Sequence, residues 1–150
     1  MKYFTLKELT QSSTAQRYGL KNTPTTDDMA ALTALVDNVL DPVREAIGKP
    51  IYVSSAFRAP EVNKKVGGVP NSQHCRGEAA DLSMRDGKEN LKLARAIYDL
   101  GVFDQLIIEN ADKQVTQCEW VHVSYSRSGN RKQVLVMYKG VKGYKPYQFK

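Results

Sequence analysis

The feature that most constrains the fold is a long amphipathic pattern in the first third of the chain. From Thr26 to Ile47, apolar residues recur at the three-and-four spacing of a helix that buries one face. The apolar positions are Met29, Leu32, Leu35, Val36, Val39, Leu40, Val43 and Ile47. Thr25 and the residues after it favour a helix start, and Gly48 favours a stop. We expect Pro42 to kink or split this helix, because proline lacks the N–H that the helical ladder needs.

The rest of the chain is typical of strands with two shorter helices between them. Strand-like β-branched and aromatic runs cover Ile51–Ser55, Ala80–Met84, Gln105–Glu109, Trp120–Tyr125 and Gln133–Tyr138. One short helix is predicted to begin at Pro60 and end at Gly67-Gly68; another covers Gly87–Leu100, with Asp86 and Glu89 as a capping box and Gly101 as its stop. We expect the loop Ser126–Lys132 to join the last two strands as a hairpin.

This order of elements predicts an α+β fold in one compact domain over residues 1–150, with N-terminal helices packed on a mainly antiparallel sheet. A hydrophobic fraction of 41% and a charged fraction of 25% exclude collagen-like and broadly disordered chains. No apolar run is long enough to span a membrane. Charges interrupt the first residues, so we expect no signal peptide and a cytoplasmic location as synthesised. We also expect a monomer.

The positive charge favours polyanionic partners without choosing among them. The net charge of +6 suits nucleic acid, anionic lipid or an anionic cell wall. Nucleic acid is disfavoured, because the chain has no helix-turn-helix, zinc-finger or RNA-binding signature. The tail Tyr138–Lys150 interleaves lysines with aromatic residues. It could bind glycan strands, wall polymer or single-stranded nucleic acid, or it could be a final strand with a solvated basic end.

Both histidines of the chain stand in or beside apolar segments with acids nearby. His74, Asp81 and His122 together offer two imidazoles and one carboxylate, a donor set suited to Zn²⁺. Three protein ligands leave a position for water, which is the pattern of a catalytic site. Spacing alone leaves open that each histidine is an ordinary core or surface residue and that Asp81 is a turn residue.

Glu119 is the spare acid of this group. It could take a proton from metal-bound water and return it to a departing amine without being a ligand. Glu119 and His122 would face opposite sides of a regular strand, so we expect Glu119 in the preceding turn or at a bulge. Cys75 and Cys118 lie beside these residues, and we expect them to be neither ligands nor a disulfide.

Several separated motifs resemble the zinc D-Ala-D-Ala carboxypeptidase family, which includes vancomycin-resistance D,D-dipeptidases and phage L-alanyl-D-glutamate endolysins. They are Ser55-Ala56-Phe57-Arg58, Asn63, Gly67-Gly68, Ser72-Gln73-His74, Gly77, Ala79, Asp81 and Glu119-Trp120-Val121-His122. The resemblance runs from about Tyr3 to Tyr125 and implies a small α+β fold also seen in the hedgehog signalling domain. It implies one zinc ion per chain on His74, Asp81 and His122, and Glu119 as the catalytic base.

Arg58 is implied by the same resemblance to bind substrate and stabilise the transition state. Its planar guanidinium suits a substrate carboxylate or an oxyanion, and the alternative is a structural salt bridge. Ser72 either hydrogen-bonds the substrate terminus or shapes the loop before His74. We expect Trp120 to be a core anchor rather than a substrate platform.

The sequence thus predicts a zinc-dependent peptidase that hydrolyses an amide bond in the peptide stem of bacterial peptidoglycan. The bond type would be that of a D,D-carboxypeptidase or of an L-Ala-D-Glu endopeptidase of the endolysin kind. Such an enzyme would act on the cell wall after phage-type release. The alternative is a non-enzymatic module of the same fold, in which zinc is structural and the surface binds cell wall or a protein.

Overall fold

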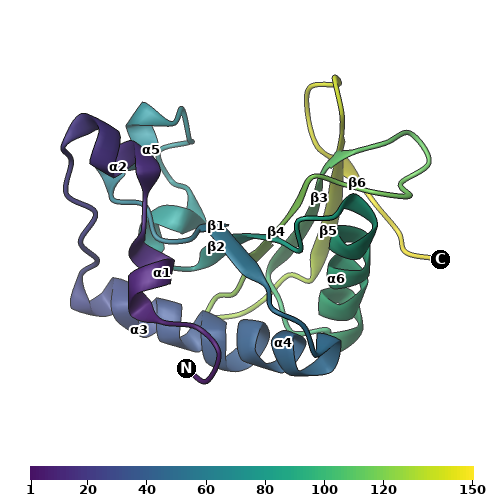
Figure 1. Cartoon of the computed structure of the whole chain (residues 1–150), viewed down its shortest axis with the longest axis horizontal. Helices are drawn as coiled ribbons and strands as arrows, with labels where there is room; N and C mark the ends of the chain where they lie inside the picture. The colour runs from purple at the N-terminus through teal and green to yellow at the C-terminus, as the bar shows by residue number, and fades with distance from the viewer.

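A six-stranded sheet forms the centre of this structure, a computed structural model that describes residues 1–150 (Figure 1). The strand order is β1-β2-β4-β3-β5-β6, and every neighbouring pair is antiparallel except β3 and β5, which run parallel. The strands are β1 (Tyr52–Ser55), β2 (Ala79–Ser83), β3 (Gln105–Ala111), β4 (Trp120–Ser124), β5 (Gln133–Tyr138) and β6 (Lys145–Pro146). The predicted α+β class with a mainly antiparallel sheet is confirmed.

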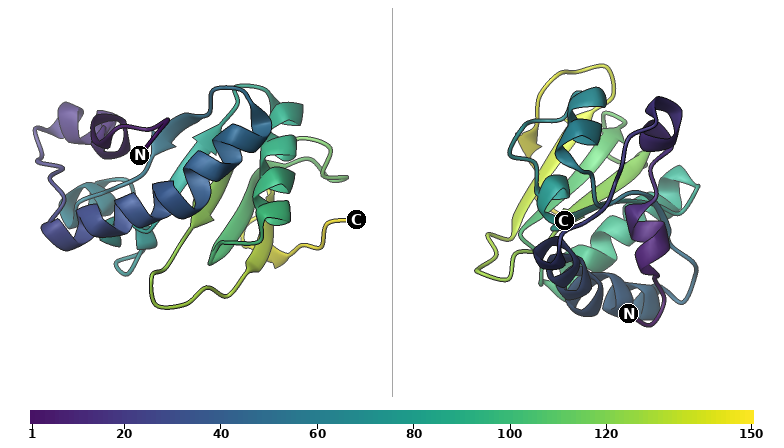
Figure 2. Two further views of the ribbon diagram at one scale, coloured as in Figure 1. Left: turned by 90° about the horizontal axis from the view of Figure 1, so that it is seen from below. Right: turned by 90° about the vertical axis from the view of Figure 1, so that its left-hand side faces the viewer.

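Helices cover one face of this sheet and one end of it (Figures 1 and 2). The α-helices are α1 (Leu6–Thr10), α2 (Ser13–Tyr18), α3 (Thr26–Leu35), α4 (Asp41–Ile47), α5 (Pro60–Lys65) and α6 (Gly87–Leu100), with a 3₁₀ turn η2 at Gln73–Arg76. Helices α4 and α6 pack against each other, and α6 packs on β3 and β4. Strand residues such as Leu82, Leu106 and Val121 face these helices in the core. None of the helices has the length and apolar character that a membrane span requires.

The predicted helix over Thr26–Ile47 exists, but Pro42 neither breaks it nor leaves it regular. Helix α3 runs into a π-helical turn, η1 (Val36–Leu40), and then into α4 along one path (Figure 2). Within this turn the N–H of Asp41 donates to the carbonyl of Val36, five residues back. Because Pro42 has no N–H to donate and its ring crowds the preceding turn, the ladder widens there rather than ending.

The hairpin predicted for Ser126–Lys132 is wrong. Strand β3 lies between β4 and β5, so the loop crosses the end of β3 instead of joining neighbours. The N–H of Lys132 donates to the carbonyl of Phe103, just before β3. Strand β3 carries a nearly continuous buried run, Leu106-Ile107-Ile108, which is typical of a strand with neighbours on both sides.

The other predicted elements agree with the structure within a few residues. Asp86 caps α6 by accepting from the N–H groups of Lys88 and Glu89, and Gly101 ends the helix with a positive φ. The capping box is only half formed, because Glu89 pairs with lysines instead of the Asp86 backbone. The tail contributes the short strand β6, in line with the final-strand interpretation.

Candidate metal centre and cleft

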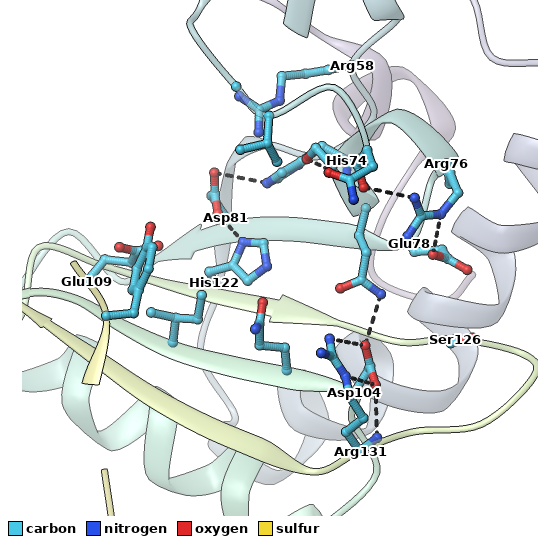
Figure 3. A pocket seen from close by; sticks show the side chains of 18 of the residues that line it. Arg58, His74, Arg76, Glu78, Asp81, Asp104, Glu109, His122, Ser126 and Arg131 are labelled. Carbon is cyan, nitrogen blue, oxygen red and sulfur yellow. Dashed lines mark hydrogen bonds and ion pairs between the residues drawn. The ribbon is translucent and has the colours of Figure 1, made fainter. Parts of the chain in front are cut away.

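The sheet face opposite the helices forms the floor of a broad polar cleft of about 1070 Å³. Successive side chains of a strand point to opposite faces, so residues that alternate with the core positions point into this cleft. Asp81 from β2 and His122 from β4 do so, and Figure 3 shows both on the cleft side of the sheet. The cleft is therefore built from alternate residues of the same strands that form the core.

The structure brings the three predicted ligands together. Asp81 and His122 are direct partners in the β2–β4 ladder, and the Nδ1 of His122 lies 3.0 Å from Oδ1 of Asp81. The Nε2 of His74 lies 3.4 Å from Oδ2 of Asp81. One donor atom from each residue falls within a group that spans no more than 4.8 Å. Donors about 3.3 Å apart are what a tetrahedral ion with bonds of about 2.0 Å requires, so the set fits zinc.

His74 is held in the orientation that a ligand needs. It is buried in η2, and its Nδ1 lies 2.6 Å from the carbonyl of Ala56, to which it donates. That bond occupies Nδ1 and leaves Nε2, on the side of Asp81, as the nitrogen available to a metal ion. Gly77 ends η2 with a φ of +71°, and a Cβ there would collide with the backbone carbonyl of Asp28. The turn that presents His74 therefore requires glycine at this position.

Asp81 is the ionised centre of the group. Burial by itself would raise the pKa of its carboxyl, but hydrogen bonds and positive charge from His122 and His74 outweigh burial and hold the pKa well below its usual range. Asp81 is therefore an anion over the whole neutral range. An anion flanked by two imidazoles is a strong attractor for a divalent cation.

Arg58 lies over the ligand group and makes no ion pair. Figure 3 shows its guanidinium near Asp81 and His74, and its Nε is buried without a hydrogen-bond partner. The structural salt bridge that the sequence left open is thus absent. A buried N–H of a guanidinium with no acceptor is costly unless a ligand supplies one.

Ser72 shapes the loop and also borders the cleft. Its hydroxyl oxygen accepts from the N–H of His74, which caps η2. The side chain lines the cleft as well. The hydroxyl proton remains free for donation, so the two roles considered for Ser72 are compatible.

At the far side of the cleft, a salt bridge anchors the loop that follows β4. The carboxylate of Asp104 accepts from the backbone N–H, Nε and Nη2 of Arg131, at 2.9, 3.0 and 2.8 Å. These bonds to Arg131 lower the pKa of Asp104 despite its burial. Sequence reasoning missed this pair, because nothing local links residues 27 positions apart.

The structure does not bring Glu119 together with the ligands. Its carboxylate accepts from Nδ2 of Asn110 at 3.0 Å and pairs with Nζ of Lys139 at 3.1 Å, in a separate smaller hollow. The bonds from Asn110 and Lys139 lower the pKa of Glu119. Glu119 precedes β4, as expected, but it lies on the side of the strand away from His122.

A different acid, Glu109 of β3, lies in the cleft. It is 4% exposed, and burial raises the pKa of its carboxyl to about 7; the charge of His122 and hydrogen bonding by Tyr144 lower this pKa, and Asp81 raises it. Figure 3 shows Glu109 beside His122, on the side away from Asp104. Sequence reasoning missed Glu109, although a carboxylate ending the apolar run Leu106-Ile107-Ile108 was a usable signal.

Trp120 lies in the cleft lining rather than in the core, and neither cysteine is in a disulfide. Trp120 is half-buried and lines the cleft on the same face as His122, so its assignment to the core is wrong. Cys75 and Cys118 are free thiols. Burial raises the pKa of both thiols, that of Cys118 to about 12.

Comparison with known proteins agrees with this site. The family model for peptidase M15 matches residues 2–124, which contain the three predicted ligands, Arg58 and both candidate acids. A search of curated proteins finds no match. The match covers more than half of the chain, and peptidases of this family are zinc-dependent enzymes of the D-Ala-D-Ala carboxypeptidase type. The chain therefore belongs to the peptidase M15 family.

Proposed function

We propose that this protein is a zinc peptidase that hydrolyses an amide bond in the peptide stem of bacterial peptidoglycan. The observation that carries the proposal is the group formed by His74, Asp81 and His122 on the floor of an open polar cleft. A purely structural zinc site is closed by four protein ligands, whereas this group offers three and faces solvent-accessible space.

The residues fit a catalytic metal ion in chemistry as well as in number. His74 is oriented by the Ala56 carbonyl, and Asp81 is an anion at neutral pH. When bound, zinc supplies a Lewis acid that polarises a carbonyl and makes water a better nucleophile. The side chains of this protein must bind the stem peptide, orient the carbonyl of the scissile amide and transfer a proton.

Arg58 and Ser72 are the candidates for binding the substrate. The unpartnered Nε of Arg58 suits a carboxylate close to the scissile bond, or the oxyanion that develops when water attacks. The Ser72 hydroxyl can donate its proton to the same end of the stem. A carboxylate next to the cleaved bond is compatible with a D,D-carboxypeptidase and with an L-Ala-D-Glu endopeptidase of the endolysin type.

Hydrolysis also requires a base that takes a proton from the attacking water. The sequence assigns this role to Glu119. To perform it, Glu119 would have to leave Asn110 and Lys139 and bring its carboxylate to the opposite face of β4. The peptidase proposal itself rests on the ligand group and Arg58, and it does not depend on Glu119.

The test is mass spectrometry of purified peptidoglycan after incubation with the zinc-loaded protein. Walls of several stem chemistries should be used, since the new ends identify the bond that is cut. We expect new amine ends with wild type and none with His122→Ala, which removes a ligand. A wild-type protein that carries zinc, binds these walls and cleaves none of them would contradict the proposal and support the non-enzymatic module.

A further inference from the structure

The register of the sheet decides which acid shares a face with the ligands. In the β3–β4 ladder, Ile107 is paired with His122 and Glu109 with Trp120. Paired residues point to the same face, and so do residues two apart along one strand. Glu109 and His122 are thus diagonal neighbours on the cleft floor, whereas Glu119 is out of phase with both.

The side chain of Glu109 lines the cleft, and one of its carboxyl oxygens lacks a hydrogen-bond partner. Its side chain is 4% exposed, and its Oε1 is buried without a hydrogen-bond partner. An unpaired buried carboxyl lowers the stability of the folded protein, so we expect Glu109 to have a functional role that accounts for its presence. Glu109 lines the same cleft as the ligand group, so a water molecule held between them would give Oε1 the missing bond.

The C-terminal segment brings a second polar group to the same place. Tyr144 lines the cleft and lies close enough for hydrogen bonding to lower the pKa of Glu109. Gly143, with a φ of +95°, turns the chain so that Tyr144 reaches the cleft before β6 begins. Tyr144 lies outside residues 2–124, so it is a feature of this chain beyond the family match.

We propose that Glu109, and not Glu119, is the base that activates the attacking water, and that Tyr144 positions its carboxylate. This inference rests on the proposed peptidase function. The carboxylate of Glu109 takes one proton from water as the oxygen bonds to the amide carbon. The C–N bond then breaks, and Glu109 returns that proton to the departing nitrogen. The products are one amine and one carboxylic acid, which keeps the second proton of the water until it ionises in solution, and Glu109 ends ionised as it began.

The electrostatics support this assignment. A base works best when its pKa lies near the operating pH, and burial moves the pKa of Glu109 in that direction. The groups that face Glu109 are His122 from β4, Asp81 from β2 and Tyr144 from the segment before β6. The pKa of Glu119 moves the opposite way, because Asn110 and Lys139 stabilise its ionised form and so weaken it as a base.

The experiment compares Glu109→Gln and Glu119→Gln with wild type. Each change is nearly isosteric and removes one carboxylate. Release of amine ends from peptidoglycan gives turnover, elemental analysis gives zinc content, and calorimetry gives affinity for an uncleaved stem peptide. We expect Glu109→Gln to keep its zinc and its peptide affinity while turnover falls about 10²–10⁴-fold, the usual contribution of a general base. Glu119→Gln should lose no more than about threefold in turnover, which corresponds to a peripheral contact.

A matched control is Glu89→Gln, since Glu89 is on α6, pairs only with Lys49 and Lys92, and lies outside the cleft. A large loss of turnover in Glu119→Gln, with near-normal turnover in Glu109→Gln, would overturn the assignment of Glu109 as the base. The proposed peptidase function would still stand. Loss of zinc or of thermal stability in Glu109→Gln would show a structural role instead. No cleavage by wild type would defeat the proposed function itself.

Tyr144→Phe tests the positioning role, because it keeps the ring and removes only the hydroxyl. We expect turnover to fall several-fold with little change in KM, and the acidic limb of the pH profile to move to higher pH. The direction follows because the hydroxyl lowers the pKa of Glu109. Unchanged turnover and an unchanged acidic limb in Tyr144→Phe would remove Tyr144 from the proposal.

Discussion

Glu109 and His122 are diagonal neighbours on one face of the sheet, although 13 positions separate them in the sequence. The turn between β3 and β4 folds the chain back so that the two residues lie on adjacent, paired strands. The regular geometry of an antiparallel ladder therefore brings a buried acid to the edge of the candidate ligand group.

Removing a histidine ligand should remove the metal. Elemental analysis of protein purified without chelator should find about one zinc ion per chain in wild type. In His74→Ala and His122→Ala the content should fall to less than about a tenth of that value, because two remaining ligands rarely retain the ion. Full zinc content in both variants would exclude this site.

Substitution of Arg58 should lower kcat/KM for the peptide substrate without lowering the stability of the fold. Arg58→Gln removes the charge that we assign to the substrate, so kcat/KM should fall about 10²–10³-fold. Arg58→Lys keeps the charge but loses the planar fork, and it should recover only part of the loss. The unfolding midpoint should not drop in either variant, because Arg58 makes no ion pair and its Nε has no partner. A marked drop would indicate a structural role.

Glu109 should make the stability of the metal-free protein depend on pH. Its pKa is raised from 4.5 to about 7 on folding, first of all by burial. The folded state therefore favours the neutral carboxyl, and its contribution to stability, present below pH 4.5, is lost as the pH rises through about 7. Glu109→Gln stays neutral, so its stability relative to wild type should increase over this interval by on the order of 3 kcal/mol.

The measurement for Glu109 is urea unfolding of chelator-treated wild type and Glu109→Gln at pH 4 and pH 8. Carboxyl groups that do not interact with Glu109 titrate equally in both proteins, so the difference between the two proteins reports on position 109 and the groups coupled to it. A difference that does not change with pH would show that Glu109 is not buried as described, whatever its catalytic role.

The cysteines should be dispensable for the metal. Cys75→Ser and Cys118→Ser should each keep full zinc content, because the donor group is complete without sulfur. Cys118→Ser should lower the free energy of unfolding by about 1–2 kcal/mol, since it places a hydroxyl in the hydrophobic core. Cys75 is only partly buried and lies outside the hydrophobic core, so it should tolerate serine with little change. Loss of zinc in either variant would show that a thiol is a ligand.

Much of the fold could be predicted from local pattern alone. The helical periodicity over Thr26–Ile47, the cap at Asp86 and the β-branched runs depend on residues a few positions apart, and the structure contains each element. The ligand types could also be named, since a chain with only two histidines leaves few candidates for an imidazole site. Local pattern did not predict the π-helical turn before Pro42. The clash between the proline ring and the preceding helical turn can be relieved either by widening the hydrogen-bond ladder of the helix or by breaking it, and the local sequence is the same in both cases.

By itself, the sequence determined the elements of this protein, their order, and the identity of the residues able to bind zinc. The tertiary structure alone decided the strand order, which inserts β3 between β4 and β5 and so brings Glu109 to the cleft. It also decided that Glu119 faces the other way, toward Asn110 and Lys139. The reason is that the direction of a strand side chain alternates with every residue, while its neighbours depend on pairings between distant segments. Proximity along the sequence, as between Glu119 and His122, therefore says little about proximity in the site.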